Sequence, residues 1–425
     1  KRILPRINED INEEWISDKT RYACDGLKNQ RLDTPYIKTQ NKFNKISWDD
    51  AYKKIVEKIK LVPPEKIGGL TGDLTNMETL FTVKEFFTKT IKSTNLDSRA
   101  ESIYINNNQR ENYIFNSQIN GIEESDLIIL IGTNPRYEST MLNARIRKSY
   151  LKNKTPIYVT GNLGDLTYPY KIIDNQTSTI KGIVEDKHEL SEKIKTSKKP
   201  IIILGQSILK MKSSGFIFEK LKEYLKINNK INYEWNSFNI ISNNASTVGS
   251  YDLNIISSDG KNNLVLDKII NNDLEILFLF GQDNLNFKKK NEYIIYIGSH
   301  GDNGSEMADI ILPGATYVEQ DGHFTNLEGK IQKAYQASFP PGDAKEDWQI
   351  INEISELIKR KKLFNNKDDL TDAMFNYLKI NKKKSNYNKQ MNDFENEEIL
   401  IDQIDYFFSN VVARASKTMA ECRNE

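Results

Sequence analysis

Five short apolar segments, each closed by a glycine, constrain the fold of this chain more than any other feature of its sequence. They occupy residues 127–132, 156–161, 200–205, 275–281 and 293–298. Strands buried on both faces read as continuous apolar runs, so such segments alternating with helices predict parallel sheets with helices on both sides. The glycines predict tight turns at the carboxyl edge of each sheet, where ligands bind in such folds. We therefore expect a doubly wound α/β fold with mainly parallel sheets.

Amphipathic helices are expected between these strands. Apolar residues recur at three- and four-residue steps over residues 48–61, and the next two prolines end that pattern. Further helices are predicted over residues 77–91, 140–151, 208–225 and 348–358. With 425 residues and 38% hydrophobic residues, the chain is long enough for two or three compact domains.

Charge and cysteine usage exclude several classes of protein. The 60 basic and 59 acidic residues leave a net charge of +1, which argues against a nucleic-acid partner. The two cysteines and three histidines are too scattered for a local iron–sulfur or zinc motif, and a disulfide framework is excluded. No apolar run approaches the roughly 20 residues that span a bilayer, so we expect no direct membrane span.

Motifs for nucleotide binding or nucleophilic catalysis are missing from the sequence. No G-x-G-x-x-G or G-x-x-x-x-G-K-[ST] occurs, and residues 68–72 are interpreted as a glycine-rich turn after a strand. No G-x-S-x-G elbow occurs either. We interpret His323 as a surface turn residue and Cys24 as a packed thiol, and the lysine-rich stretch 381–389 as a solvated surface.

The most informative stretch is 299–351, with A-D-I-I-L-P-G-A at 308–315, T-N-L-E-G-K-I-Q at 325–332 and P-P-G-D-A-K-E-D-W at 340–348. These motifs resemble the molybdopterin oxidoreductase superfamily, and within it most closely the large iron–sulfur subunits of respiratory complex I. The opening segments 2–6, 8–21 and 25–32 and the final segment 413–420 are similar to the same subunits. The resemblance therefore covers nearly the whole chain.

This resemblance implies a division of the chain. Residues 1–45 would follow the iron–sulfur region of the family, residues 46–100 and 198–360 would form a first α/β domain, and residues 101–197 an inserted α/β domain. Residues 361–425 are expected to form a polar, helical tail. The C-terminal β-barrel of the active molybdenum enzymes is not expected, because only 77 residues follow Trp348.

The resemblance also implies a function without chemistry in this chain. The cysteine ligands that hold one 2Fe-2S and two 4Fe-4S clusters in the family are absent, so we expect those clusters in a missing N-terminal part or a partner chain. The implied role is a non-catalytic scaffold in the peripheral arm of NADH:ubiquinone oxidoreductase. Expected partners are the flavin- and NADH-binding subunit and a ferredoxin-like segment. The implied location is the matrix side of the mitochondrial inner membrane, or the cytoplasmic side in a bacterium.

We expect no catalytic, cofactor-binding or metal-binding residue in this chain. The alternative hypothesis is a molybdopterin- or nucleotide-binding oxidoreductase whose cofactor cradle combines Gly281 to Asn284 with Thr325 to Gln332, a Gly281/Asn326 cleft. The missing metal ligand and the missing barrel favour the scaffold over this alternative.

Overall fold

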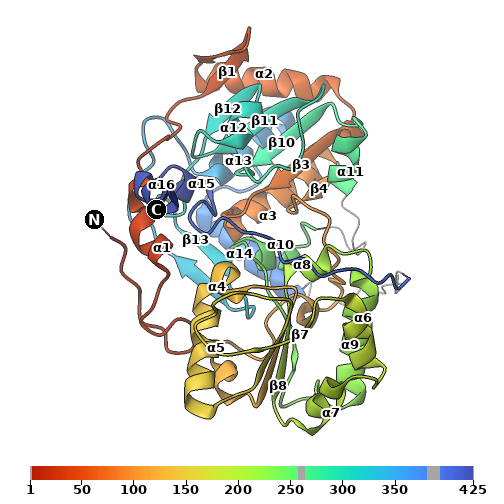
Figure 1. The fold of residues 1–425 in the computed structure, drawn as a ribbon. Coiled ribbons are helices and arrows are strands. Elements are labelled where there is room, and N and C mark those ends of the chain that lie inside the picture. The colour runs from red at the N-terminus through yellow and green to blue at the C-terminus, as the bar shows by residue number, and fades with distance from the viewer. Residues whose placement is uncertain (1, 257–263, 381–392, 425) are drawn as a thin grey trace.

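The computed structural model describes residues 2–256, 264–380 and 393–424, and two largely parallel sheets organise them (Figure 1). Each sheet lies in its own half of the molecule, and helices cover both of its faces. The predicted doubly wound α/β fold is confirmed. The lysine-rich stretch 381–389 lies outside the described residues.

The first sheet has seven strands in the order β2-β1-β12-β11-β10-β3-β4. Its strands are β1 (Tyr36–Thr39), β2 (Lys42–Lys45), β3 (Ile67–Thr71), β4 (Leu96–Asp97), β10 (Ile276–Phe280), β11 (Tyr293–Gly298) and β12 (Ile310–Pro313). The strands from β12 to β4 are parallel, whereas β1 and β2 form an antiparallel edge. Gly68 and Gly69, which we expected in or near a turn, lie within β3 itself.

Side chains of the central strand β10 alternate between two cores, as a pleated strand requires. Phe278 packs in a cluster with the helices α2 (Trp48–Leu61), α3 (Met77–Glu85) and α13 (Asp347–Lys359). Leu277 and Leu279 face the opposite cluster, which includes residues of α11 (Leu264–Ile270). Both faces of the sheet are therefore buried at this strand, which explains its continuous apolar sequence.

The second sheet has five parallel strands in the order β7-β6-β5-β8-β9. They are β5 (Leu127–Ile131), β6 (Ile157–Thr160), β7 (Lys171–Asp174), β8 (Pro200–Leu204) and β9 (Phe238–Ile240). We expected residues 198–360 to belong wholly to the first unit, but β8 pairs with β5 and β9 pairs with β8. The inserted unit therefore runs beyond residue 197, and the expected boundary there is corrected.

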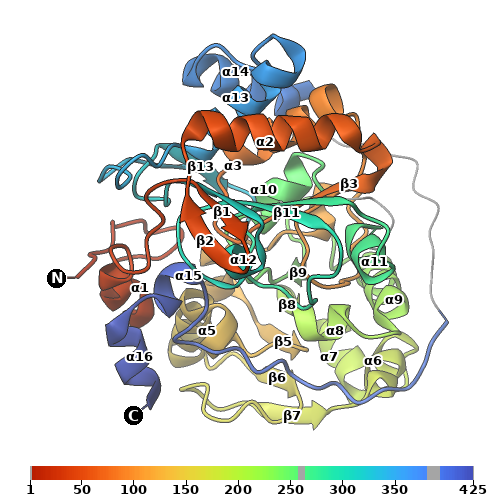
Figure 2. The ribbon, with the colours of Figure 1, turned by 90° about the horizontal axis from the view of Figure 1, so that it is seen from above.

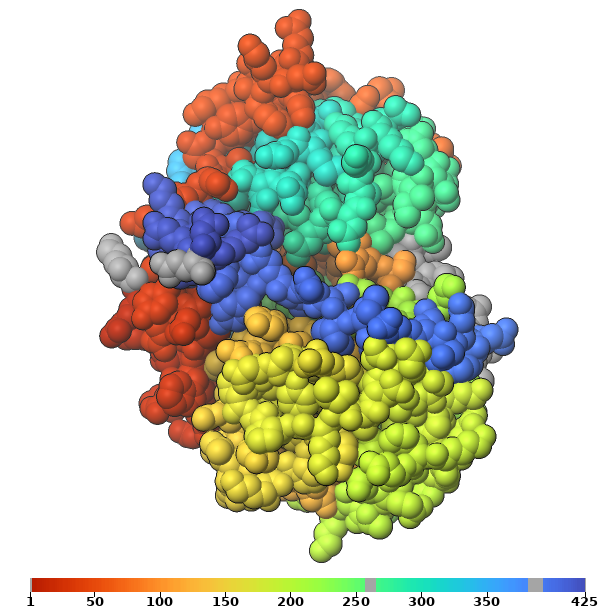
Figure 3. Space-filling model, in the orientation of Figure 1, coloured from red at the N-terminus to blue at the C-terminus, as the bar shows by residue number. Residues whose placement is uncertain are grey.

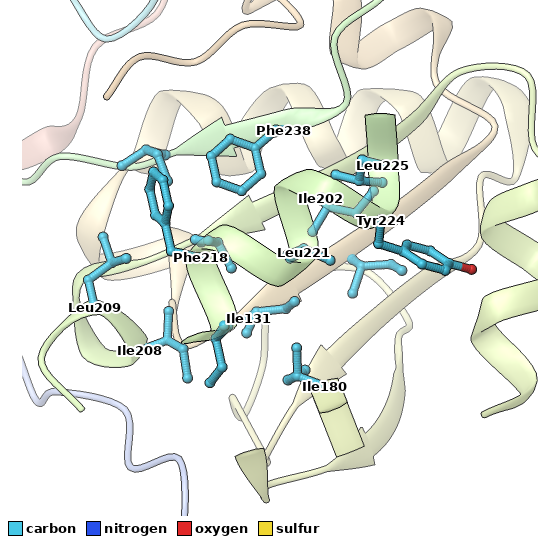
Figure 4. Packing of buried hydrophobic residues seen from close by; sticks show 14 of the residues in the cluster. Ile131, Ile180, Ile202, Ile208, Leu209, Phe218, Leu221, Tyr224, Leu225 and Phe238 are labelled. Atoms are coloured by element: carbon cyan, nitrogen blue, oxygen red, sulfur yellow. The ribbon is translucent and has the colours of Figure 1, made fainter. Parts of the chain in front are cut away.

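One large apolar cluster holds the second half together (Figure 4). Ile131 and Ile202 from the sheet pack against Phe218, Leu221 and Leu225 of α9 (Ser214–Ile227). All five side chains are buried to 1% exposure or less. At about 25 cal/mol per Å² of buried apolar surface, such side chains supply most of the stability of this half.

The predicted helix 208–225 is split in the structure. The short α8 (Gln206–Leu209) ends before α9 begins, and the backbone N–H of Ser213 donates to Glu397 at 2.9 Å. The predicted helix 77–91 starts as α3 and continues as a π-helical stretch, Phe86–Ile91.

Other helices before the C-terminal region are α1 (Asp18–Tyr22), α4 (Pro135–Glu138), α5 (Thr140–Asn153), α6 (Thr177–Val184), α7 (Glu189–Thr196), α10 (Thr247–Asp252) and α12 (Asn303–Met307). Short 3-10 turns lie at Ala23–Asp25, Pro64–Lys66, Arg110–Asn112 and Asn120–Glu124.

The C-terminal region is only partly the helical tail that we expected. Its described residues include the helices α14 (Lys367–Ile380), α15 (Val411–Arg414) and α16 (Lys417–Asn424). Residues 393–410 are instead irregular, with one isolated bridge between Glu398 and Gln176. We call residues 393–416 the strap. Seen from above, it runs along one side of the molecule and brings α16 next to α1 at the N-terminal end (Figure 2).

Two further features complete the fold. Strands β13 (Gly322–Thr325) and β14 (Ile331–Ala334) form a separate antiparallel hairpin that packs on α3. Among the described residues, no helix combines the length and the apolar character that crossing a membrane requires.

Candidate functional site: the cleft between the two sheets

A cavity of about 580 Å³ lies where the carboxyl edges of the two sheets face each other. Its walls include residues that directly follow strands of the first sheet, Asp73 after β3 and Asp283 after β10. The second sheet contributes Gln206 after β8 and Asn243 after β9. This is the edge at which the glycine-terminated strands predicted a ligand site, so the cavity is the candidate functional site.

The strap lies across this cleft in the space-filling view, between the halves that carry the two sheets (Figure 3). Its first part is fastened to the second half by hydrogen bonds. The Ser213 hydroxyl and the backbone carbonyl of Glu395 are bonded, and the backbone N–H of Glu397 donates to Thr177 at 2.8 Å. The Ile399 side chain is only 2% exposed, because it enters the core of that half.

The middle of the strap closes one wall of the cavity. The backbone N–H of Asp402 donates to the Ser207 hydroxyl at 2.9 Å, and its carboxylate accepts from the Lys210 ammonium at 2.6 Å. Asp402, Asp405 and Phe408 all line the cavity. Part of this cleft is therefore walled by the chain's own C-terminal segment.

The end of the strap is bound to the first half through Arg414. The Arg414 guanidinium Nε donates to the Asp302 carboxylate at 2.6 Å, and Nη1 donates to Asn284 at 3.4 Å. The neighbouring Ser416 hydroxyl donates to Asp25. The strap thus ties the loops after β10 and β11 to the N-terminal region.

Two carboxyl groups lie close to Arg414, the buried Asp283 and the half-buried Asp73. Burial is the main cause that raises the pKa of Asp283 to about 7, and nearby Asp302 adds to this effect. The Tyr296 hydroxyl donates to Asp283 at 2.9 Å and the Gly304 N–H donates at 3.0 Å, which opposes the rise. Burial likewise raises the pKa of Asp73 to about 6, and the charge of Arg414 partly offsets it. At neutral pH the Asp283 carboxyl therefore lies near the midpoint of its titration, whereas the Asp73 carboxyl is mostly ionised.

Comparison with known proteins identifies the family to which this chain belongs. The model of the molybdopterin oxidoreductase family matches residues 31–357, which is most of the chain. The chain belongs to the molybdopterin oxidoreductase family. Two further models match its ends: the 4Fe-4S domain of NADH-ubiquinone oxidoreductase NDSU1/NuoG-like proteins at residues 1–25, and the C-terminal domain of the NuoG-type subunit of NADH-ubiquinone oxidoreductase at residues 377–422.

Several related proteins share 35–37% sequence identity with this chain over 99% of its length. They include the NADH-ubiquinone oxidoreductase 75 kDa subunit of Reclinomonas americana (36%), the NuoG-type subunit of NADH-quinone oxidoreductase from Rickettsia bellii (37%) and the mitochondrial NADH-ubiquinone oxidoreductase 78 kDa subunit of Candida albicans (35%). The chain spans 64%, 62% and 60% of their respective lengths. The predicted resemblance to large complex I subunits is confirmed.

Solved structures with the same fold are more distant in sequence. Acetylene hydratase from Pelobacter acetylenicus aligns with a TM-score of 0.57 and 14% identity, covering 89% of this chain and 67% of that chain. A chain of the formyltransferase/hydrolase complex from Methylorubrum extorquens aligns with a TM-score of 0.58 and 10% identity, covering 77% of this chain and 99% of that chain. These similarities concern the fold alone.

The cleft of this family member does not suit a molybdopterin cofactor. Phosphate groups of such a cofactor need free cations or free backbone N–H groups. The three basic side chains that line the cavity already have partners. Lys210 binds Glu101 and Asp402, Arg99 binds Asp97, and Lys19 lies over the Tyr406 ring. Acidic side chains outnumber them, with Asp73, Glu101, Glu138, Asp283, Asp402 and Asp405 on the walls.

The structure does not bring together the two segments, 281–284 and 325–332, that the alternative hypothesis combines into a cofactor cradle. Gly281 has a φ of +62°, so it turns the chain after β10, and Asp283 and Asn284 line the cleft. Asn326 lies in the turn of the β13–β14 hairpin, where its side chain accepts from the Lys330 N–H at 2.8 Å. None of residues 325–332 lines the cleft. Within the described part of the chain, no group of three or more His, Cys, Asp or Glu side chains is arranged to hold a metal ion.

The positions of His323 and the two cysteines in the structure differ from those that we expected from the sequence. His323, which we interpreted as a surface turn residue, lies in β13, and its Nδ1 is 2.5 Å from the Glu78 carboxylate. Glu78 is only 1% exposed, so this pair anchors the hairpin to α3. Cys24 is half-buried and Cys422 is exposed; neither belongs to a disulfide, and they lie on neighbouring elements near the two ends of the chain.

Proposed function

We propose that this chain is a non-catalytic scaffold in the peripheral arm of NADH:ubiquinone oxidoreductase, on the matrix side of the mitochondrial inner membrane. It would brace the iron–sulfur path from NADH and FMN to ubiquinone. The observation that carries this proposal is the N-terminal segment, which matches the 4Fe-4S domain model and presents apolar side chains to solvent. The 2Fe-2S and 4Fe-4S clusters would belong to the part of the subunit that docks there.

The N-terminal segment is held firmly although its apolar side chains are exposed. Leu4, Ile7 and Trp15 are 63%, 73% and 56% exposed. The segment is bound to α5, because the buried Arg145 guanidinium donates to the Glu9 carbonyl and forms an ion pair with Glu13. Several large exposed apolar side chains on one ordered segment are typical of a protein interface.

Two more apolar features extend this surface. The hairpin strand β14 leads into Tyr335 and Phe339, which are 55% and 83% exposed, and the Arg6 guanidinium lies 5.4 Å from the centre of the Tyr335 ring. A cavity of about 320 Å³ between the segment and α5 is lined by Trp15, Met141 and other residues. We assign this combined surface to a cluster-bearing, ferredoxin-like domain next to the flavin subunit.

Affinity purification of the tagged chain from its own cells in mild detergent tests this function. We expect iron, FMN and NADH-oxidising activity to co-purify with it, and no molybdenum. The substitution Ile7→Asp places a charge in the proposed interface and should reduce co-purified iron by about tenfold or more. Ile227→Asp is the matched control, because Ile227 is 77% exposed at the far end of α9.

The possible outcomes separate the assigned surface from the function. Iron and flavin retained in full by Ile7→Asp would refute the surface and leave the function standing. Stoichiometric molybdenum or pterin without iron or flavin would refute the scaffold and favour the cofactor-binding oxidoreductase.

A further inference from the structure

A second, small cavity lies at the carboxyl edge of the first sheet and shares Asp283 with the wall of the large cleft. It has a volume of about 40 Å³ and is lined by residues after β3, β10, β11 and β12. Val411 and Val412 of the strap also line it, so the strap covers this edge of the sheet. A volume of this size holds one or two water-sized occupants.

Three side chains around this cavity each carry a buried oxygen without a hydrogen-bond partner. They are the carboxylate Oδ1 of Asp347, the amide Oε1 of Gln320 and the hydroxyl Oγ1 of Thr316. The three residues are 8%, 6% and 5% exposed. Buried polar atoms without a hydrogen-bond partner are destabilising, so three around one cavity favour an occupant that satisfies them.

The geometry of the neighbouring groups fixes how these oxygens are presented. The Gln320 amide nitrogen donates to the Ala315 carbonyl at 3.1 Å, which leaves Oε1 as an acceptor. A Cβ on Gly314 would lie 2.1 Å from Asp347 Oδ1, so this oxygen lies against the backbone at the end of β12. Gly298, at the end of β11, lines the same cavity. Asp347 Oδ1 therefore faces the gap between two strand ends.

The charge around Asp347 also favours a cation. Within the described residues, no basic side chain forms an ion pair with Asp347. The charged groups that act on Asp347 are the carboxylates Glu346 and Glu319, and together with burial, which is the larger cause, they raise its pKa to about 8. The Asp347 carboxylate therefore lacks a counter-charge, which a bound cation would supply.

We propose that this cavity binds a dehydrated alkali-metal cation, Na⁺ or K⁺, through Asp347, Gln320 and Thr316. Asp283 also lines the cavity, but the Tyr296 hydroxyl and the Gly304 N–H already donate to its two oxygens. The single unbonded carboxylate oxygen of Asp347, with neutral amide and hydroxyl oxygens, matches a single positive charge and a hard cation. A transition metal is not favoured, since nitrogen and sulfur ligands do not line the cavity. This inference is independent of the proposed scaffold function.

Thermal unfolding of the purified chain at constant ionic strength tests the proposal. We expect a higher melting temperature in KCl or NaCl than in tetramethylammonium chloride, whose cation is too large for the cavity. At ion concentrations above the dissociation constant, each tenfold rise in the free ion concentration should raise the ratio of folded to unfolded protein about tenfold. Comparing KCl with NaCl identifies the preferred ion.

The variant Asp347→Asn should lose this ion dependence, because it removes the only carboxylate among the three ligands. Asp343→Asn is the matched control: it makes the same charge change four residues away, on an exposed side chain. Ion dependence that persists in Asp347→Asn, or equal melting temperatures in all three salts, would overturn the proposal. A water molecule in the cavity, or protonation of Asp347, would then account for the unbonded oxygens.

A second measurement does not depend on a variant that folds. Crystals of the wild-type chain soaked in a thallium(I) salt should give an anomalous peak in contact with Asp347 Oδ1 and Gln320 Oε1. Absence of a peak there at saturating thallium would also refute the site.

Discussion

The strap is expected to open locally when Arg414 is replaced by Met. The Arg414 side chain is 20% exposed and that of its partner Asp302 is 13% exposed, so their hydrogen bond of 2.6 Å is only partly screened by water. A hydrogen bond between charged groups contributes about 1.5–3 kcal/mol. With the long contacts to Asn284 at 3.4 Å and to the Phe408 carbonyl at 3.3 Å counted as negligible, Arg414→Met should cost about 2 kcal/mol, or about 30-fold in the opening equilibrium.

Hydrogen exchange of backbone amides measures this opening directly. The Ala413 and Ala415 N–H groups are bonded within the strap, and their exchange should accelerate by about 30-fold in Arg414→Met. The Phe278 amide in the centre of the first sheet should not change. Arg423→Met is the control, because Arg423 is 53% exposed and its ion pair with Asp405 should be worth no more than about fivefold.

Two outcomes would refute this reasoning about the strap. Unchanged exchange at Ala413 and Ala415 would mean that the Arg414 ion pair does not hold the segment. An equal acceleration at Phe278 would mean that the strap does not open as a separate unit, and that the whole chain unfolds instead.

Two further predictions concern buried charges. Because burial raises the pKa of Asp283 to about 7, the folded chain binds a proton that the unfolded chain has released above pH about 4, so stability should fall as pH rises from about 4 to 7. Asp283→Asn should remove part of this slope, measured by urea unfolding at several pH values; an unchanged slope would contradict the assignment. Glu319→Gln should destabilise the chain by about 3–5 kcal/mol, because it leaves the buried Arg31 without its bidentate partner. The double variant Arg31→Met, Glu319→Leu should be more stable than Glu319→Gln in the same assay, and a less stable double variant would contradict this.

The strands were predictable because their sequence carries a local signal. The segment 293–298 was expected as a strand and is β11 with the same bounds, and the helix 48–61 is α2 with the same bounds. What the sequence could not reveal was which sheet each strand joins. The apolar run of β8 resembles that of β10, and only the long-range pairing of β8 with β5 places it in the second sheet.

The strap was not predictable for a different physical reason. Residues 393–410 were expected to be helical, but they form neither a helix nor a regular strand, so their position depends on single side chains that meet distant partners. Asp402 reaches Lys210 and Arg414 reaches Asp302, across separations of 192 and 112 residues. Such contacts leave no periodic pattern in the sequence.

The candidate site was predictable only in its position. The glycine after β10 correctly marked the sheet edge at which Asp283 lines the cleft, whereas Asn326 proved to belong to a hairpin turn. The three unsatisfied oxygens of the small cavity are contributed by residues 316, 320 and 347. Their convergence depends on how α13 meets the end of β12, which no local motif encodes.

The two cavities together explain how an enzyme-like fold can serve as a rigid support. In an open α/β cleft the strand ends are left for a ligand, and their polar groups would be costly to bury without one. Here the strap supplies Arg414 to the acidic loops after β10 and β11, and Val411 and Val412 cover the small cavity. The proposed cation would satisfy the oxygens that remain. Because the strap contacts both halves through its own side chains, a cluster-bearing domain docked on the N-terminal segment would rest on a single body.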